Sequence, residues 1–151
     1  MRLTRWAALL AVLCLTPDAA HAQSRKAARA ERKIAAVMTD LREEMRVYNR
    51  ELDFFRRVPE YKPLSDLRNR LDTQAVRVVE LETAGPGSNP ALRELAREME
   101  RTAREMRALT VRLDARAEAG APKDVRRVAD RLNEQAGQIV RTIDRFAVMF
   151  R

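Results

Sequence analysis

The longest regular pattern of apolar residues in the chain runs from Ile34 to Phe55. Successive apolar positions are separated alternately by four and three residues, and they are Ile34, Met38, Leu41, Met45, Tyr48, Leu52 and Phe55. Heptad spacing of this kind places a narrow apolar stripe along one side of a helix whose other sides are charged. A single helix cannot bury such a stripe alone, so the pattern predicts partner helices elsewhere in the chain.

Three later segments show the same heptad spacing. The first contains Leu64, Leu67, Leu71, Gln74, Val78 and Leu81. The second contains Leu92, Leu95, Met99, Thr102, Met106, Leu109 and Leu113. The third contains Val125, Val128, Leu132, Gln135, Ile139, Ile143, Phe146 and Phe150. The period of two that is typical of half-buried strands does not occur, so the pattern predicts an all-α protein.

Proline and glycine residues separate these segments. Val58-Pro59 ends the first helix, Pro63 suits the first turn of the second, and Gly85–Pro90 and Ala119–Pro122 are turns. Helices are therefore predicted over about 25–57, 63–84, 90–119 and 122–150. Because the connections are short, we expect an up-down-up-down antiparallel four-helix bundle. The alternative is a longer antiparallel coiled coil that completes its core by forming a homodimer.

The N-terminus has the pattern of a bacterial export signal. Arg2 and Arg5 precede an apolar run from Trp6 to Leu15, and Ala20-His21-Ala22 fits a signal-peptidase site. We predict a signal peptide over 1–22, cleavage between Ala22 and Gln23, and a mature helical domain over 23–151 in the periplasm or outside the cell. The mature chain would keep no cysteine and no histidine, so packing alone must hold it together.

The formal charge of the chain is +8, and in the predicted mature chain it is +7. Most basic residues are interleaved with acidic ones, as on solvated helix faces, which argues against a nucleic-acid partner. The exception is the start of the mature chain, with Arg25, Lys26, Arg29, Arg32 and Lys33. This segment is a candidate arm for anionic lipid or cell-wall polymer. The alternative is a frayed terminal flank that serves only solubility.

Three heptad positions at similar height in the predicted bundle are polar: Gln74, Thr102 and Gln135. They could form a buried polar layer that fixes helix register, or line a small cavity for a ligand. In the third interpretation the helices are rotated so that Ala75, Ala103 and Ala136 face inward. The polar side chains then lie at the edge of the core.

The sequence contains no candidate catalytic or metal-binding residues. Glu-x-x-His, nucleophile-elbow, phosphate-loop and dinucleotide motifs are missing from it, and the acidic residues avoid the heptad positions. Met38, Met45, Met99 and Met106 could supply thioethers to a soft metal, but methionine at core positions usually fills space. We therefore predict a protein that is not an enzyme and has no cofactor or metal.

The C-terminal residues suggest a family. The chain ends with Ile143, Asp144, Arg145, Phe146, Ala147, Val148, Met149, Phe150 and Arg151. With the export signal and four helices, this layout resembles the exported four-helix cytochromes of the cytochrome c-prime and soluble cytochrome b types. In the c-type branch the end reads Cys-x-x-Cys-His-x-x-Phe/Tyr-Arg, and the b-type branch has a methionine ligand on its first helix.

Phe150-Arg151 matches that ending, and Met38 corresponds to the methionine ligand. Ile143 and Phe146 replace the two cysteines, and Ala147 replaces the haem-binding histidine. The resemblance therefore implies a bundle that has lost its haem, with Phe146 filling part of the vacated space and no cofactor site retained.

Together these features favour a non-enzymatic exported bundle with a structural or interaction role in the cell envelope. An envelope protein, anionic lipid or cell-wall polymer is the expected partner. One alternative is a small-ligand-binding or haem-less cytochrome-like bundle that uses the polar core positions. A second is a periplasmic chaperone-like protein of similar size and charge.

Overall fold

A computed structural model describes residues 17–85 and 89–151, with side-chain burial described from Arg25 onward. It contains four α-helices: α1 (Pro17–Leu52), α2 (Tyr61–Thr83), α3 (Asn89–Glu118) and α4 (Lys123–Val148). A single turn of 3-10 helix, η1 (Asp53–Phe55), follows α1. All regular secondary structure in the described residues is thus helical, as the heptad spacing predicts.

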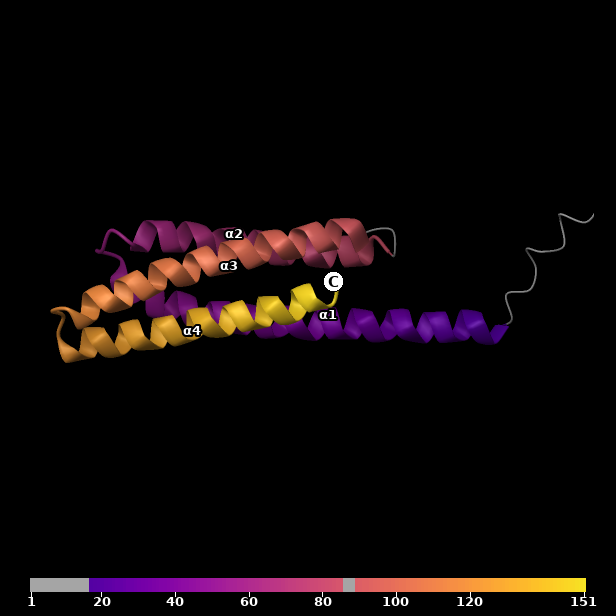
Figure 1. Cartoon of the computed structure of the whole chain (residues 1–151), viewed down its shortest axis with the longest axis horizontal. Helices are drawn as coiled ribbons and strands as arrows, with labels where there is room; N and C mark the ends of the chain where they lie inside the picture. The colour runs from indigo at the N-terminus through magenta and orange to yellow at the C-terminus, as the bar shows by residue number, and fades with distance from the viewer. Residues whose placement is uncertain (1–16, 86–88) are drawn as a thin grey trace, which may run out of the picture. The chain divides into compact units, whose positions relative to one another are not determined.

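The chain divides into two compact units between Lys33 and Ile34, and the bundle is the second of them, Ile34–Arg151. Figure 1 shows the chain reversing direction between successive helices of the bundle, so that α3 returns along α2 and α4 returns along α3. The contacts of α3 with α4, α1 with α4 and α2 with α3 are those of an up-down bundle. The predicted all-α, up-down-up-down fold class is confirmed.

The core is built from the predicted heptad stripes. In α1 and η1 all seven apolar positions from Ile34 to Phe55 are buried, and Leu41 and Tyr48 are fully inaccessible. Leu81, Leu109, Val125 and Phe150, near the outer edges of the later stripes, are only partly buried. A straight helix has 3.6 residues per turn, so a strict heptad stripe drifts slowly around it. Neighbouring positions therefore enter the core as the stripe turns away.

Alanines supply many of these additional core positions. They are Ala75, Ala96, Ala103, Ala117, Ala129, Ala136 and Ala147. A helix in a four-helix bundle buries a wider face than the two-position seam of a coiled coil, and alanine widens that face without separating the helices.

The helix boundaries differ from the predicted ones mainly around α1. Our prediction of a first helix over 25–57 was wrong at both ends: α1 already begins at Pro17 and ends at Leu52. Proline is favoured in the first turn of a helix, where its missing N–H is not needed. At the other end Pro59 disfavours helical geometry just before it, and the chain passes through η1 instead.

The turns follow the local residues. Gly85, after α2, has φ = +95°, a conformation that favours glycine because it has no Cβ. Pro63 lies in the first turn of α2, which begins two residues earlier than predicted. Within the predicted turn Gly85–Pro90, residues 86–88 lie outside the described residues, and Asn89 is the first residue of α3. Of the predicted export signal over 1–22, only 17–22 are described, and they belong to α1.

Candidate functional site

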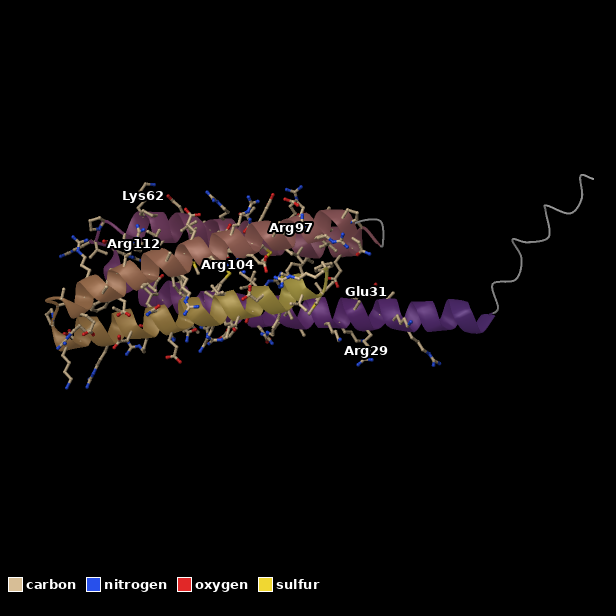
Figure 2. The ribbon with its side chains drawn as sticks, in the orientation of Figure 1. Arg29, Glu31, Lys62, Arg97, Arg104 and Arg112 are labelled. Atoms are coloured by element: carbon tan, nitrogen blue, oxygen red, sulfur yellow. The ribbon has the colours of Figure 1, made fainter. Side chains whose placement is uncertain are left out.

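The basic segment, Arg25–Lys33, lies within α1 and is helical throughout. At 100° of rotation per residue, its five cations fall within an arc of about 120° on one side of the helix. They are Arg25, Lys26, Arg29, Arg32 and Lys33. Glu31, the one acidic residue of the segment, lies outside this arc. Figure 2 shows Arg29 and Glu31 on opposite sides of α1. The sequence shows the charges, but only the helical geometry gathers them on one face.

None of these five cations has an ion pair or side-chain hydrogen bond with a described residue, and all five side chains are exposed. The rest of the segment consists of Glu31 and three alanines, Ala27, Ala28 and Ala30. The segment therefore offers a cationic face and no large apolar side chain. Such a face can attract an anionic surface electrostatically, without inserting anchors into it.

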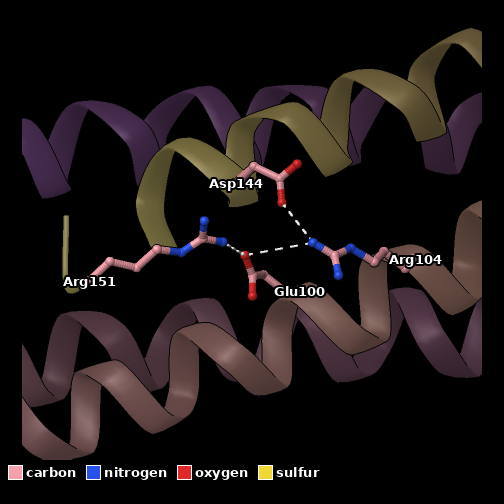
Figure 3. Close-up of polar contacts among 4 residues, drawn as sticks. All are labelled: Glu100, Arg104, Asp144 and Arg151. Carbon is pink, nitrogen blue, oxygen red and sulfur yellow. Dashed lines mark hydrogen bonds and ion pairs between the residues drawn. The ribbon is translucent and has the colours of Figure 1, made fainter. Parts of the chain in front are cut away.

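Cations in the bundle are often paired instead, as Figure 3 shows for α3 and α4. Arg104 lies 3.8 Å from Glu100 and 3.5 Å from Asp144, and Arg151 lies 2.7 Å from Glu100. Glu100 is the least exposed member of this group, with 14% of its side-chain surface accessible. Two guanidinium groups share it, so these charges stabilise the contact of the two helices rather than bind a partner.

A second polar group joins α1 and α4. The hydroxyl of Thr142 donates a 2.8 Å hydrogen bond to Oε1 of Glu44 and accepts one of 3.0 Å from Arg145. Arg145 also pairs with Asp40 at 3.0 Å. Partial burial raises the pKa of Glu44, and the Thr142 hydrogen bond opposes that shift only in part. Oε2 of Glu44 is buried without a hydrogen-bond partner among the described residues.

These residues also line part of a cavity of about 670 Å³ that includes Gln138, Arg141 and Val148. We did not predict this α1–α4 site from the sequence. A signal for it was present, because Asp40 and Glu44 repeat at i,i+4 on one helix and Arg141 and Arg145 repeat at i,i+4 on another. To predict the site from these two pairs, one would have to know that the first and fourth helices are neighbours.

The structure brings two of the three predicted polar core residues together. Gln74 on α2 and Thr102 on α3 both line a cavity of about 380 Å³, with Arg70 and Arg101 at its edge. Gln74 is 9% exposed, and its Oε1 is buried without a partner in the described part of the chain. Gln135 is half-buried and does not line this cavity.

Thr102 makes its hydrogen bond within its own helix, to the carbonyl oxygen of Glu98 at 3.0 Å. Ala75, Ala103 and Ala136 are buried, at 3%, 0% and 0% exposure. Gln74 and Thr102 are buried as well, at 9% and 4% exposure, whereas Gln135 is half-buried. No three-residue polar layer crosses the core.

The polar contact that does cross the core is one that we did not predict. The hydroxyls of Tyr48 on α1 and Thr110 on α3 are 2.9 Å apart, and both side chains are fully buried. Thr110 donates its own hydrogen to the carbonyl oxygen of Met106, so the Tyr48 hydroxyl is the donor of the pair. Burial raises the pKa of Tyr48 well above its ordinary value. Heptad spacing placed Tyr48 inside but could not identify its partner.

Met38 and the residues that replace the haem-binding positions lie in the packed core, whereas Phe150 is half-buried and Arg151 is exposed. Met38, Ile143, Phe146 and Ala147 are all buried, and the ring of Phe146 packs edge-on against Phe150 with centroids 5.0 Å apart. The other seam methionines, Met45, Met99 and Met106, are buried as well. Within 17–85 and 89–151, no three His, Cys, Asp or Glu side chains are grouped closely enough to hold a metal ion.

Comparison with protein-family models, curated proteins and solved structures finds no match to this chain. Among the described helices, none is both long enough and apolar enough to cross a membrane.

Proposed function

We propose that this is a non-enzymatic, exported helical-bundle protein that binds anionic lipid surfaces of the bacterial cell envelope through its basic segment. The observation that carries the proposal is the group of five exposed cations on one helical arc, none of them paired with an acidic side chain among the described residues. Their arrangement supports a planar partner, because side chains on one side of a helix can reach a flat surface together. The export-signal pattern of the N-terminus supports an envelope location.

The charge distribution supports the same proposal. Residues 34–151 carry 23 basic and 20 acidic residues, whereas the nine residues of the basic segment carry five basic and one acidic. The field that a partner meets at the segment is therefore strongly positive, while most of the bundle is nearly balanced. Each Lys or Arg near an anionic membrane contributes about 1 kcal/mol of attraction.

The test is co-sedimentation of the purified protein with lipid vesicles that contain or lack anionic lipid. We expect binding only to the anionic vesicles, and loss of that binding between about 0.1 M and about 1 M salt, where the Debye length shortens from about 10 to about 3 Å. Replacing all five cations of the basic segment with glutamine should weaken binding by more than about 1,000-fold.

A matched control removes the same charge from the bundle. It replaces five arginines that have no ion pair in the described structure: Arg57, Arg70, Arg77, Arg101 and Arg127. This variant should keep most of the vesicle affinity. Equal losses in both variants would show a response to net charge alone. Salt-sensitive capture by an anionic cell-wall polymer, without binding to vesicles, would contradict the lipid assignment and leave a polymer as the partner.

A second candidate function is a small-ligand-binding bundle, the use expected of a haem-less relative of the four-helix cytochromes. The cavity lined by Gln74 and Thr102 favours it, since an unpartnered buried amide oxygen costs about 1–3 kcal/mol that a hydrogen-bond donor in a ligand would recover. Native mass spectrometry of protein from its own cells tests this function. Extra mass that is lost in Gln74→Leu would support it, and a bare chain in both proteins would refute it.

A further inference from the structure

Two arginines converge over the single glycine inside α4. A Cβ atom placed on Gly137 would lie 3.5 Å from Nη1 of Arg141 and 3.9 Å from both Cζ and Nη2 of Arg107. The guanidinium groups of α3 and α4 thus both come within 4 Å of one point on the bundle surface. Two like charges brought this close repel each other unless an anion lies near them.

Carboxylates lie near these two arginines but form no ion pair with them. Neither Arg107 nor Arg141 forms an ion pair or side-chain hydrogen bond with a described residue. Arg104, one turn before Arg107 on α3, contrasts with them, since Glu100 and Asp144 both pair with it. Glu44 acts on Arg141 at longer range and lines a cavity with it, so the charge of Arg141 is compensated only in part within the fold. The pair is arranged as an anion-binding site.

An apolar groove begins beside this pair. Ala108 and Val111 of α3 and Val140 of α4 line a depression of about 570 Å³, together with Arg104, Arg107 and Arg112. Val111 is 46% exposed there, although its side chain is apolar. Figure 2 locates Arg104 and Arg112 on α3. The volume lies in the range of small-molecule sites.

We propose that this groove between α3 and α4 binds a single-chain anionic amphiphile of the fatty-acid class. The carboxylate would accept hydrogen bonds from the guanidinium groups of Arg107 and Arg141, and the alkyl chain would cover Val111, Ala108 and Val140. Charge complementarity selects the occupant, because three arginines and no carboxylate line the groove. Arg104 is paired with Glu100 and Asp144, whereas Arg107 and Arg112 have no ion pair with a described residue. This site is separate from the basic segment and goes beyond the proposed function.

The experiment is isothermal titration calorimetry of the full chain with three monomeric probes. Dodecanoate carries the charge and the chain, acetate carries the charge alone, and dodecyltrimethylammonium carries the same chain with the opposite charge. We expect saturable one-site binding of dodecanoate and no measurable binding of the other two. Equal binding of acetate would overturn the amphiphile assignment. Equal binding of the cationic probe would reduce the site to an apolar patch.

Paired variants then locate the site. Arg107→Gln combined with Arg141→Gln should weaken dodecanoate binding at least about tenfold, because two charge-assisted hydrogen bonds are lost. Arg77→Gln combined with Arg127→Gln removes the same charge from unpaired arginines of α2 and α4 and should leave binding unchanged. If the control pair weakens binding as much, the site is not at Gly137.

A second pair of variants, one test and one control, examines the apolar part of the groove. Val111→Asn should also weaken dodecanoate binding about tenfold, since a valine side chain no longer covers the chain. Val76→Asn alters a valine of α2 that is 53% exposed and should have no effect. Far-ultraviolet circular dichroism establishes that all the variants keep their helices. Unchanged affinity in folded Val111→Asn would show that the alkyl chain lies elsewhere, and so would overturn the proposal.

Discussion

The basic segment and the α1–α4 contact use the same residue types to opposite effect. In Arg25–Lys33, five cations share one helical arc and none meets an acid in the described structure. In the α1–α4 contact, Arg145 meets both Asp40 and Thr142, and Thr142 in turn holds Glu44. Charges that are satisfied within the fold orient its helices. Charges left unsatisfied are available to a partner, and the four predictions below test that division.

The largest expected effect comes from moving charge within the basic segment without changing its total. Arg29→Glu combined with Glu31→Arg keeps five cations and one anion, but puts the anion inside the cationic arc. Each charge near an anionic membrane is worth about 1 kcal/mol, so affinity for anionic vesicles should fall about 30-fold. The midpoint of thermal unfolding should stay unchanged. An unaltered vesicle affinity would show that the arc is irrelevant and only net charge matters.

On the paired side of the comparison, Thr142→Val replaces the linking hydroxyl with a methyl group of similar size. Glu44 and Arg145 each lose a hydrogen bond at a partly buried contact, which should cost about 1–2 kcal/mol of unfolding free energy in chemical denaturation. Thr39→Val is the control, since the hydroxyl of Thr39 is exposed and bonds only within its own helix. If both variants lose equal stability, the α1–α4 contact contributes nothing specific.

Gly137→Ala tests whether the chain can become more stable to unfolding while Arg107 and Arg141 remain available to a partner. Alanine is favoured over glycine inside a helix by about 1 kcal/mol, and the new Cβ fits without a clash. The variant should therefore unfold at a higher temperature than the native chain. A lower unfolding temperature would mean that Arg107 and Arg141 cannot move aside for the new methyl group. Their side chains would then be more tightly fixed than those of exposed cations.

The smallest effect is a pH dependence carried by Glu44. Its pKa is raised in the fold, mainly by burial, so the folded state holds the proton more tightly than the unfolded state. Its contribution is therefore present at acidic pH and is lost as pH rises through the raised pKa of the folded state. Denaturation curves of Glu44→Gln and the native chain should converge at acidic pH, with Glu44→Gln the more stable at neutral pH. Parallel pH profiles would contradict this assignment.

The fold could be predicted because its signal is local. Apolar residues at heptad spacing need an apolar partner whatever the remainder of the chain does, and proline and glycine mark where each helix must stop. This is why all seven heptad positions between Ile34 and Phe55 proved to be buried. The errors lay mainly at the ends of α1, where no glycine marks either boundary.

The functional residues also divide into those that local sequence predicts and those that only helix packing brings together. Composition and order alone placed the cations in Arg25–Lys33, and the helical geometry of α1 gathers them on one face. Sequence could not reveal that Thr110 accepts from Tyr48, that Thr142 links Glu44 to Arg145, or that Arg107 and Arg141 meet over Gly137. Each of these contacts joins residues on different helices, so it depends on the rotation and height of each helix against its neighbour. A heptad stripe fixes which side of a helix is buried, and packing in three dimensions decides which polar side chains then meet.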